Sequence, residues 1–262
     1  MSAARIVAVL PPIPVPEPER ERRRAQYARF CAPGTTVDVR LLRGGPELTD
    51  REYELSWAAG FMVLEAERAA AEGAAGIVID CTADPGLEQI AEGVDVPVVG
   101  ALSSAVHLAM QLGGRFSILA LDGHWARMIG ARLRSYGLAD RAASIEVVGA
   151  HVYRPAGPAG GGAGGGAPDG GAEFQGLLEA AGRKALDAGA DSVILGSTTV
   201  IQGREELERA LGVPVVAPGV AALKAVEAMI DMGLRPSRRA YPRPAIAYGR
   251  TMEAWLFPEG RA

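Results

Sequence analysis

The chain is poor in cysteine, with only two such residues among 262. Two cysteines cannot form the disulfide framework of a small secreted protein, and their scarcity favours a reducing compartment. We therefore expect a cytoplasmic protein. Aromatic residues are also scarce, at 5% of the chain, whereas hydrophobic residues as a whole reach 48%. The core must therefore be built mainly from Ala, Val, Leu and Ile.

No charge of one sign dominates, and no long apolar run is present. The formal net charge is −4, and the basic-looking segment 19–29, ERERRRAQYAR, contains glutamates that favour a solvated helix face. Nothing here attracts nucleic acid or an anionic membrane. No stretch approaches the ~18 consecutive apolar residues of a membrane span. The prolines within residues 11–18 argue against a signal peptide and favour a first strand that runs into a Pro-rich loop.

Short β-branched runs alternate with longer segments of helical periodicity, such as 52–73. The expected strands are 5–10, 36–42, 76–80, 96–100, 116–121, 145–152, 192–196 and 213–219. Apolar strands that alternate with helices predict an α/β protein whose parallel sheets are covered by helices on both faces. Eight such units could close into one barrel or divide into two open four-stranded sheets.

An internal repeat favours two sheets. Residues 73–81 read GAAGIVIDC and residues 189–197 read GADSVILGS, and each is followed by a helical segment and a second strand containing Val-Pro-Val-Val. A repeat of this size predicts two similar α/β lobes related by a pseudo-twofold axis, with an active site in the cleft between them. We expect the first lobe to comprise residues 1–101 and 212–262, and the second to comprise residues 102–211.

A glycine-rich segment, 156–171, carries nine glycines in 16 residues. Its G-x-G-x-x-G match carries no weight, because any glycine tract contains one and no strand–turn–helix context accompanies it. We expect a flexible insertion in the second lobe, and a mobile flap over the site is the alternative.

The repeat places Cys81 and Ser197 at the carboxyl ends of equivalent strands, where open α/β sheets bind ligands. A pseudo-twofold axis would make the two residues face each other. Asp84 and Pro85 predict the cap and first turn of a helix, whose N-terminus would lower the pKa of a nearby thiol and bind a carboxylate. We expect a functional thiol at Cys81, with a buried structural cysteine as the alternative. Cys31, at an expected helix end, is interpreted as structural.

The histidines give weaker signals. His124 follows the strand at 116–121, where it could contact substrate or transfer a proton, and an ordinary loop histidine is the alternative. Its neighbour Trp125 could line a pocket. His107 lies in an apolar helical pattern and is expected in the core, and His151 is isolated. Without a cluster of Cys, His and Asp we expect no metal site.

The motifs VIDCTADPGL, VPVVGALSSAVHLAMQLGGRFSILAL and DSVILGSTTV, with GVPVVAPGVAALKAVEAMIDMGL after them, resemble the aspartate/glutamate racemase superfamily, nearest its hydantoin racemase branch. The resemblance covers nearly the whole chain. It implies two α/β lobes, a small-molecule substrate, no cofactor and a homo-oligomer. It also implies one cysteine in each lobe, which take and return the α-proton on opposite faces. Cys81 matches the first cysteine, and Thr82, Ala83, Thr198 and Thr199 match residues that hold substrate oxygens.

Three positions depart from this family pattern. The first strand ends in VLPPIP, the segment LDGHWAR at 121–127 lacks the usual small hydroxyl residues, and Ser197 occupies the place of the second cysteine. A serine hydroxyl is too weak an acid to supply a resident base near pH 7, whereas a thiol with a pKa of about 8.5 can be tuned into that range.

Three functions therefore stay open. The first is a racemase or isomerase acting at an acidic carbon beside a carboxylate or carbonyl, as in an amino acid or hydantoin. It would use Cys81 as base or nucleophile and Ser197 as hydrogen-bond or weak proton donor. The second is a single-thiol enzyme, either an arylmalonate decarboxylase-like lyase or a maleate isomerase-like enzyme. The third is a non-catalytic ligand-binding protein.

Overall fold

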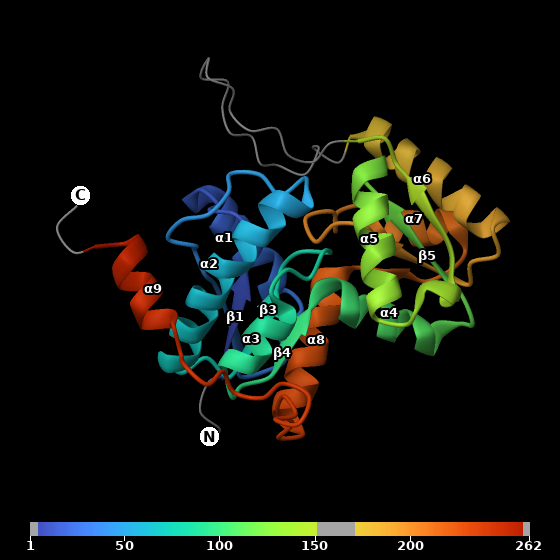
Figure 1. Ribbon diagram of the computed structural model, residues 1–262. Coiled ribbons are helices and arrows are strands. Elements are labelled where there is room, and N and C mark those ends of the chain that lie inside the picture. Colours follow the sequence, from blue (N-terminus) through green and yellow to red (C-terminus); the bar gives the residue numbers. More distant parts are fainter. Residues whose placement is uncertain (1–4, 151–170, 259–262) are drawn as a thin grey trace, which may run out of the picture.

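Two parallel sheets form the molecule, as seen in a computed structural model that describes residues 5–150 and 171–258 (Figure 1). The first has the order β2-β1-β3-β4 and the second the order β6-β5-β7-β8. The strands are β1 Arg5–Leu10, β2 Thr35–Val39, β3 Gly76–Ile79, β4 Val98–Gly100, β5 Phe116–Ala120, β6 Ala142–Val147, β7 Ser192–Leu195 and β8 Val215–Val216. The matching strand orders confirm the prediction of two α/β lobes.

The helices cover both faces of each sheet, as the apolar strands require. They are α1 Glu17–Ala28, α2 Glu52–Ala71, α3 Leu87–Gly93, α4 Ala101–Leu112, α5 Gly123–Ser135, α6 Ala172–Asp187, α7 Arg204–Leu211, α8 Pro218–Asp231 and α9 Gly249–Leu256, with a 3₁₀ turn at Ala139–Arg141. In the first lobe, α2 and α3 pack on one face of the sheet, and α1 and α8 pack on the other. In the second lobe, α6 and α7 oppose α4 and α5.

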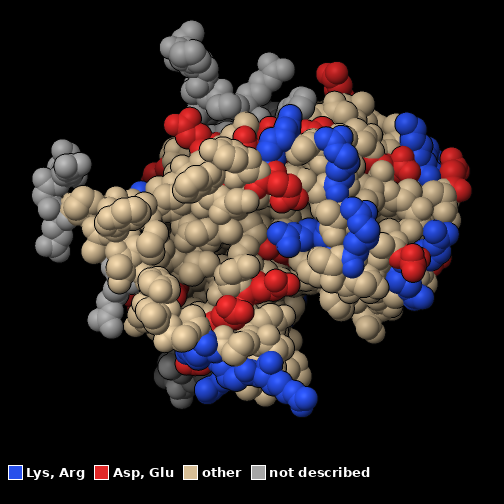
Figure 2. Space-filling view, in the orientation of Figure 1, with Lys and Arg blue, Asp and Glu red and all other residues tan. Residues whose placement is uncertain are grey.

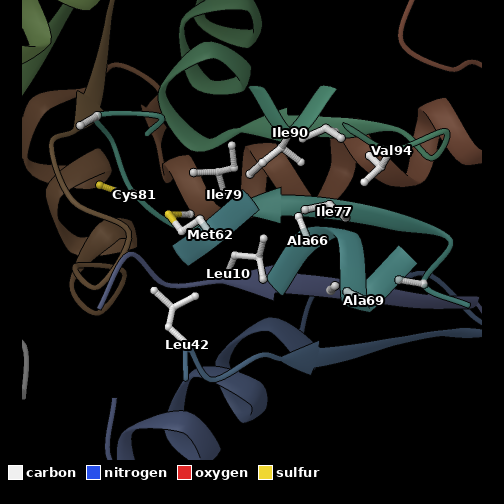
Figure 3. Packing of buried hydrophobic residues seen from close by; sticks show 14 of the residues in the cluster. Leu10, Leu42, Met62, Ala66, Ala69, Ile77, Ile79, Cys81, Ile90 and Val94 are labelled. Atoms are coloured by element: carbon white, nitrogen blue, oxygen red, sulfur yellow. The ribbon is translucent and has the colours of Figure 1, made fainter. Parts of the chain in front are cut away.

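Successive residues of one strand serve opposite layers of the core. In β1, Ala8 and Leu10 join the cluster under α2 and α3, whereas Val7 and Val9 join the cluster under α1 and α8. This is the two-residue alternation of a strand buried on both sides. Figure 3 shows the first of these clusters, with Cys81 at the end that lies beyond β3. Cys81 thus lies where the packed core of the first lobe reaches the carboxyl edge of the sheet.

The lobes are joined by α4 and α8, which pack against each other in the middle of the molecule (Figure 1). The boundary expected at residue 212 needs correction. Val215 and Val216 form β8, which pairs with β7 in the second sheet, so the second lobe continues past 212. The chain returns to the first lobe with α8, which packs on β3 and β4. The expected insertion at 156–171 lies outside the described residues except for Gly171, which precedes α6.

The surface is of mixed charge. Figure 2 shows Lys and Arg interspersed with Asp and Glu on one face, beside an uncharged region over α2 and α9. Exposed aromatic side chains on these two helices include Tyr53, Trp57 and Trp255. Within residues 5–150 and 171–258, no helix is both long enough and apolar enough to cross a bilayer.

Candidate active site

A cavity of about 110 Å³ lies where the carboxyl ends of the two sheets meet. It is lined by Pro12, Ile13, Arg23, Leu48, Thr49, Asp50, Asp80, Cys81 and Thr82 from the first lobe, and by Leu121, Asp122, Trp125, Ala150, Gly196, Ser197, Thr198 and Thr199 from the second. Parallel sheets leave their ligand crevices at this edge. The volume is smaller than that of a typical drug-binding pocket, which points to a small ligand.

Cys81 presents a buried thiol to this cavity. The residue is only 6% exposed. Burial raises the pKa of its thiol to about 12, and the negative charges of Asp84 and Asp80 act in the same direction. The backbone N–H of Ala83 and the Arg23 guanidinium oppose this rise without cancelling it. Cys81 therefore carries its proton at neutral pH.

Asp84 does not cap the helix that follows Cys81, so this expectation was wrong. The helix α3 begins only at Leu87, whereas the Asp84 carboxylate accepts hydrogen bonds from the backbone N–H groups of Leu102 (2.9 Å) and Ser103 (2.7 Å) at the start of α4. Asp84 holds a positive φ of 46° to do so. A Cβ at Gly100 would lie 2.3 Å from the Asp84 Cγ, so only glycine leaves room for this carboxylate. The expected help of a helix N-terminus in lowering the Cys81 pKa is thus missing.

A buried ion network lies beside the thiol. The Asp80 carboxylate accepts one hydrogen bond from Arg23 Nη1 at 2.5 Å and another from Tyr27 Oη at 2.6 Å. Arg23 Nε also donates to Glu19 Oε1 at 2.8 Å. Burial by itself would lower the pKa of Arg23, but Asp80 and Glu19 raise it above its ordinary value. The site therefore contains a permanent cation, held by two carboxylates.

This network corrects the interpretation of segment 19–29 as a solvated face. Helix α1 points Arg23 and Tyr27 inward, where they are 8% and 2% exposed, while Arg24 pairs with Glu21 in solvent. A weak signal for this network was present in the sequence, because an aspartate directly before the cysteine needs a partner once it is buried.

The second strand end is built differently. Ser197 Oγ and Thr199 Oγ1 lie 2.9 Å apart, and the Thr199 backbone N–H donates to Ser197 Oγ at 3.3 Å. Gly196 stands in the place that Asp80 holds in the first lobe. A Cβ there would lie 2.2 Å from the backbone oxygen of Leu119, so β5 excludes any side chain. The second strand end thus offers hydroxyl groups and no charge.

The two strand ends are tied together by a reciprocal pair of hydrogen bonds. Thr82 Oγ1 donates to the backbone oxygen of Gly196 at 2.8 Å, and Thr198 Oγ1 donates to that of Asp80 at 3.3 Å. Each threonine thus reaches the residue that precedes the opposite cysteine or serine. This arrangement follows the pseudo-twofold relation expected from the repeat, and it directs Cys81 and Ser197 into one cavity.

Comparison with known proteins agrees with this architecture. The sequence model of the Asp/Glu/hydantoin racemase family matches residues 22–226. The chain belongs to this family. It is 30% identical over 202 residues to a hydantoin racemase of Pseudomonas sp. (strain NS671), with 76% of both chains covered. A hydantoin racemase of Paenarthrobacter aurescens is 28% identical over 215 residues, which is 81% of this chain and 86% of the relative. The structure of the allantoin racemase from Klebsiella pneumoniae matches with a TM-score of 0.81 at 25% identity, over 93% and 95% of the two chains.

Most of the site residues expected from the sequence meet in the cavity of this racemase-family chain. Cys81, Thr82, Ser197, Thr198 and Thr199 all line it. The hydroxyl hydrogens of Thr82 and Thr198, however, are directed at the opposite lobe and join the two strand ends. Ser197 and Thr199 share one hydrogen bond, so one of their two hydroxyl hydrogens stays available for a ligand.

Ala83 and the histidines are placed differently. Ala83 does not line the cavity but donates its backbone N–H to Cys81. His124 is not among the lining residues either, and its Nδ1 lies 2.5 Å from Arg127 Nη2, whereas its neighbour Trp125 does line the cavity. His107 was wrongly expected in the core: it is exposed, with Nδ1 2.7 Å from the backbone oxygen of Ser103. His151 lies outside the described residues.

Besides Asp80, two further cavity carboxylates were not predicted from the sequence. Asp50 comes from the loop before α2, and Asp122 follows β5 in the departing segment LDGHWAR. Asp122 Oδ1 accepts hydrogen bonds from the backbone N–H groups of His124 (2.7 Å) and Trp125 (2.9 Å), so it caps α5. The aspartate directly after a strand was a usable signal. In the part of the chain that the structure describes, no three His, Cys, Asp or Glu side chains gather as they would around a metal ion.

Proposed function

We propose that the protein is a cofactor-independent racemase that inverts a carbon acid beside a carbonyl group, with hydantoin-like rings as its substrate class. One observation carries the proposal: the buried thiol of Cys81 from the first lobe and the hydroxyl groups of Ser197 and Thr199 from the second lobe line one small cavity. The hydantoin racemases among the relatives support the choice of substrate class.

The part of the cavity lining that the second lobe supplies suits the charge that develops in such a reaction. Removal of the proton beside a carbonyl moves negative charge onto the carbonyl oxygen, which hydrogen-bond donors stabilise in a site from which water is excluded. The hydroxyl hydrogen left over by the Ser197–Thr199 pair is one such donor. Arg23 lines the same cavity, but Asp80 and Glu19 compensate its positive charge. The spare hydroxyl hydrogen therefore lowers the free energy of the enolate.

Cys81 acts as the proton donor once the ring-carbon proton has left from the other face of the substrate and the enolate has formed. Its raised pKa of about 12 keeps the thiol protonated at neutral pH. The thiol therefore gives its proton to the enolate carbon on one face, and the resulting thiolate is the base for the reverse direction. Ser197 serves as a hydrogen-bond donor, because its hydroxyl is too weak an acid to form a resident base.

The test follows each enantiomer of 5-benzylhydantoin and of allantoin in D₂O. Chiral chromatography reports inversion, and NMR reports loss of the proton on ring carbon 5. We expect both enantiomers of at least one compound to converge on the deuterated racemate well ahead of an enzyme-free blank. Rates equal to the blank for both compounds, with a correctly folded protein, would refute the proposal.

A single-thiol lyase is the second candidate, and the position of the other cysteine favours it. Cys31 Sγ lies 3.6 Å from the backbone oxygen of Tyr27, and the residue packs beside α8, away from the cavity. Cys81 is therefore the cavity thiol. One thiol is enough to protonate the carbanion left after decarboxylation. Carbon dioxide release from 2-methyl-2-phenylmalonate, without exchange on hydantoins, would favour this function. The same samples would report fumarate formation from maleate, and binding without turnover would indicate a non-catalytic protein.

A further inference from the structure

The turn that follows Cys81 is tied to the second lobe at two points. Thr82 Oγ1 donates to the backbone oxygen of Gly196 at 2.8 Å. Two residues further on, the Asp84 carboxylate accepts a hydrogen bond from Tyr136 Oη at 2.6 Å. The backbone N–H of Asp84 donates to the backbone oxygen of Cys81 at 3.1 Å, which closes the turn. The position of Asp84 therefore restrains the backbone of Cys81.

Asp84 belongs to the first lobe by its backbone, but groups of the second lobe hold its carboxylate. Besides Tyr136, the donors are the backbone N–H groups of Leu102 and Ser103 at the start of α4. Leu102 lies in a buried cluster of the second lobe, and Tyr136 packs against the same cluster. Burial and the Asp84 charge raise the pKa of Tyr136, so its hydroxyl keeps its proton and donates it. Asp84 is only 1% exposed, so its charge depends on these protein donors.

One face of α5 leads from the active-site cavity to this contact. Trp125, Met128, Arg132 and Tyr136 follow one another at intervals of three or four residues, which places them on one side of the helix. Trp125 lines the active-site cavity together with Cys81. Met128 lies in the buried cluster of the first lobe that also contains Cys81. Tyr136 directly follows the helix and reaches Asp84. This face thus joins the second lobe to the surroundings of the thiol.

Packing is incomplete around the Asp84–Tyr136 pair. Both residues line a second cavity of about 410 Å³ that lies between the lobes. Its other lining residues include Leu55, Ala59 and Val63 from α2 and Arg132 from α5. Because side chains do not fill this space, dispersion contacts do less here to fix α5 against the first lobe. The 2.6 Å hydrogen bond therefore supplies a restraint that close packing supplies elsewhere.

We infer that Tyr136 is a positioning residue for Cys81 and acts through Asp84, holding the turn 81–84 in a fixed place relative to the second-lobe side of the cavity. The catalytic meaning of this inference rests on the proposed racemase function. A misplacement of about 1 Å between reacting groups can cost roughly 100-fold in rate. Tyr136 is not among the described residues that line the active-site cavity. It therefore affects the rate of proton transfer and not the binding of the ring.

The first test is the full-length Tyr136→Phe variant, which removes the hydroxyl and keeps the ring. We expect kcat for racemisation of 5-benzylhydantoin to fall roughly tenfold, with KM unchanged within about twofold. Asp84→Gly removes the carboxylate and accepts the positive φ of this position. Adding Tyr136→Phe to Asp84→Gly should cause no further loss, because Tyr136 acts through that carboxylate.

The second test does not depend on the reaction. Iodoacetamide alkylation of Cys81 is measured at one fixed pH in a Cys31→Ser background. A turn without its Tyr136 restraint opens more often, so we expect Tyr136→Phe to be alkylated at least about fivefold faster. This measurement decides the inference even if Asp84→Gly does not fold.

The matched control is Ser117→Ala. Ser117 is fully buried, and its hydroxyl lies 2.9 Å from Ser144 Oγ, so this contact joins β5 to β6 within the second lobe. Its loss removes a buried hydrogen bond without touching the contact between the lobes. We expect wild-type kcat and wild-type alkylation of Cys81 in this variant.

Four results would overturn the inference while leaving the proposed function intact. These are wild-type kcat and alkylation in Tyr136→Phe, a raised KM with unchanged kcat, a further loss when Tyr136→Phe is added to Asp84→Gly, and the same changes in Ser117→Ala. Failure of the wild-type protein to racemise would instead remove the proposed function. The alkylation rates would then decide by themselves whether Tyr136 positions Cys81.

Discussion

The two strand ends that meet in the cavity share a backbone arrangement and differ in chemistry. Residues 80–82 and 196–198 exchange equivalent hydrogen bonds through Thr82 and Thr198. We call this pair of threonine hydrogen bonds the clamp. Beside the clamp, Asp80 lies in a buried ion network, whereas the backbone of β5 leaves no room for a side chain at Gly196. The two halves of the fold thus share the contact that aligns them, while each half has its own electrostatics.

The largest expected effect concerns Cys81 and Ser197, which occupy equivalent positions at the two strand ends. Cys81→Ala should lower hydantoin racemisation about 10³-fold, because it removes a proton-transfer group. Ser197→Ala should lower it no more than about tenfold, the usual effect of one hydrogen bond. Chiral chromatography on 5-benzylhydantoin measures both rates. Equal losses in the two variants would mean that Ser197 has taken over the role of a full acid–base partner.

The pH dependence of Cys81 alkylation is the next test, carried out with iodoacetamide in a Cys31→Ser background. Because the thiol pKa is raised to about 12, its thiolate fraction at pH 7.5 should be roughly three orders of magnitude below that of an ordinary cysteine. The rate should climb with pH up to about pH 12, whereas the denatured protein reaches its plateau near pH 9. A plateau near pH 8 to 9 in the folded protein would contradict the burial argument.

The raised pKa of Cys81 also predicts how the free energy of unfolding depends on pH. The folded pKa of Cys81 exceeds the unfolded one, so the stability that it contributes is complete below about pH 8.5 and is lost as the pH rises toward about 12. Cys81→Ala should flatten this part of the stability profile.

The ion network around Asp80 should be the main contribution of the first strand end to the stability of the protein. Arg23→Gln leaves the Asp80 carboxylate buried without its cation and should cost about 3–5 kcal/mol in the free energy of unfolding. Arg24→Gln is the matched control on the same helix, because the exposed Arg24–Glu21 pair is solvated and its loss should change little. Urea unfolding measures both variants. A small effect of Arg23→Gln would show that Tyr27 and water satisfy Asp80 without the guanidinium.

The smallest expected effect tests the clamp itself. Thr82→Val and Thr198→Val each leave one backbone oxygen without its donor and should cost about 1 kcal/mol. Thr82→Val should cost more, because its hydrogen bond is 2.8 Å long and that of Thr198 is 3.3 Å long. Thermal unfolding of both variants, with the exposed Thr36→Val as control, ranks them. The reverse order would show that the two halves of the clamp differ in a way that these lengths do not reveal.

Much of the architecture was predictable because its causes are local. Strand and helix periodicity reports burial over a few neighbouring residues, and it identified the strands to within a few positions. The repeat at 73–81 and 189–197 then indicated two lobes, and the polarity of parallel sheets placed Cys81 and Ser197 at the ligand-binding edge. The ends of strands and the shortest strands were harder to predict from the sequence. For example, β8 contains only Val215 and Val216, and only its pairing with β7 assigns it to the second sheet.

The residue pattern is therefore enough to predict the fold class and to place the thiol at a strand end. The tertiary structure alone decided the electrical environment of that thiol. Asp84 caps α4 rather than α3, and Arg23 reaches Asp80 from a helix 57 residues earlier in the chain. Packing between segments far apart in the sequence determines which groups pair with these carboxylates. The burial of each carboxylate determines how much free energy its charge costs. For that reason a sequence pattern can locate Cys81, but only the folded molecule shows that its proton is held.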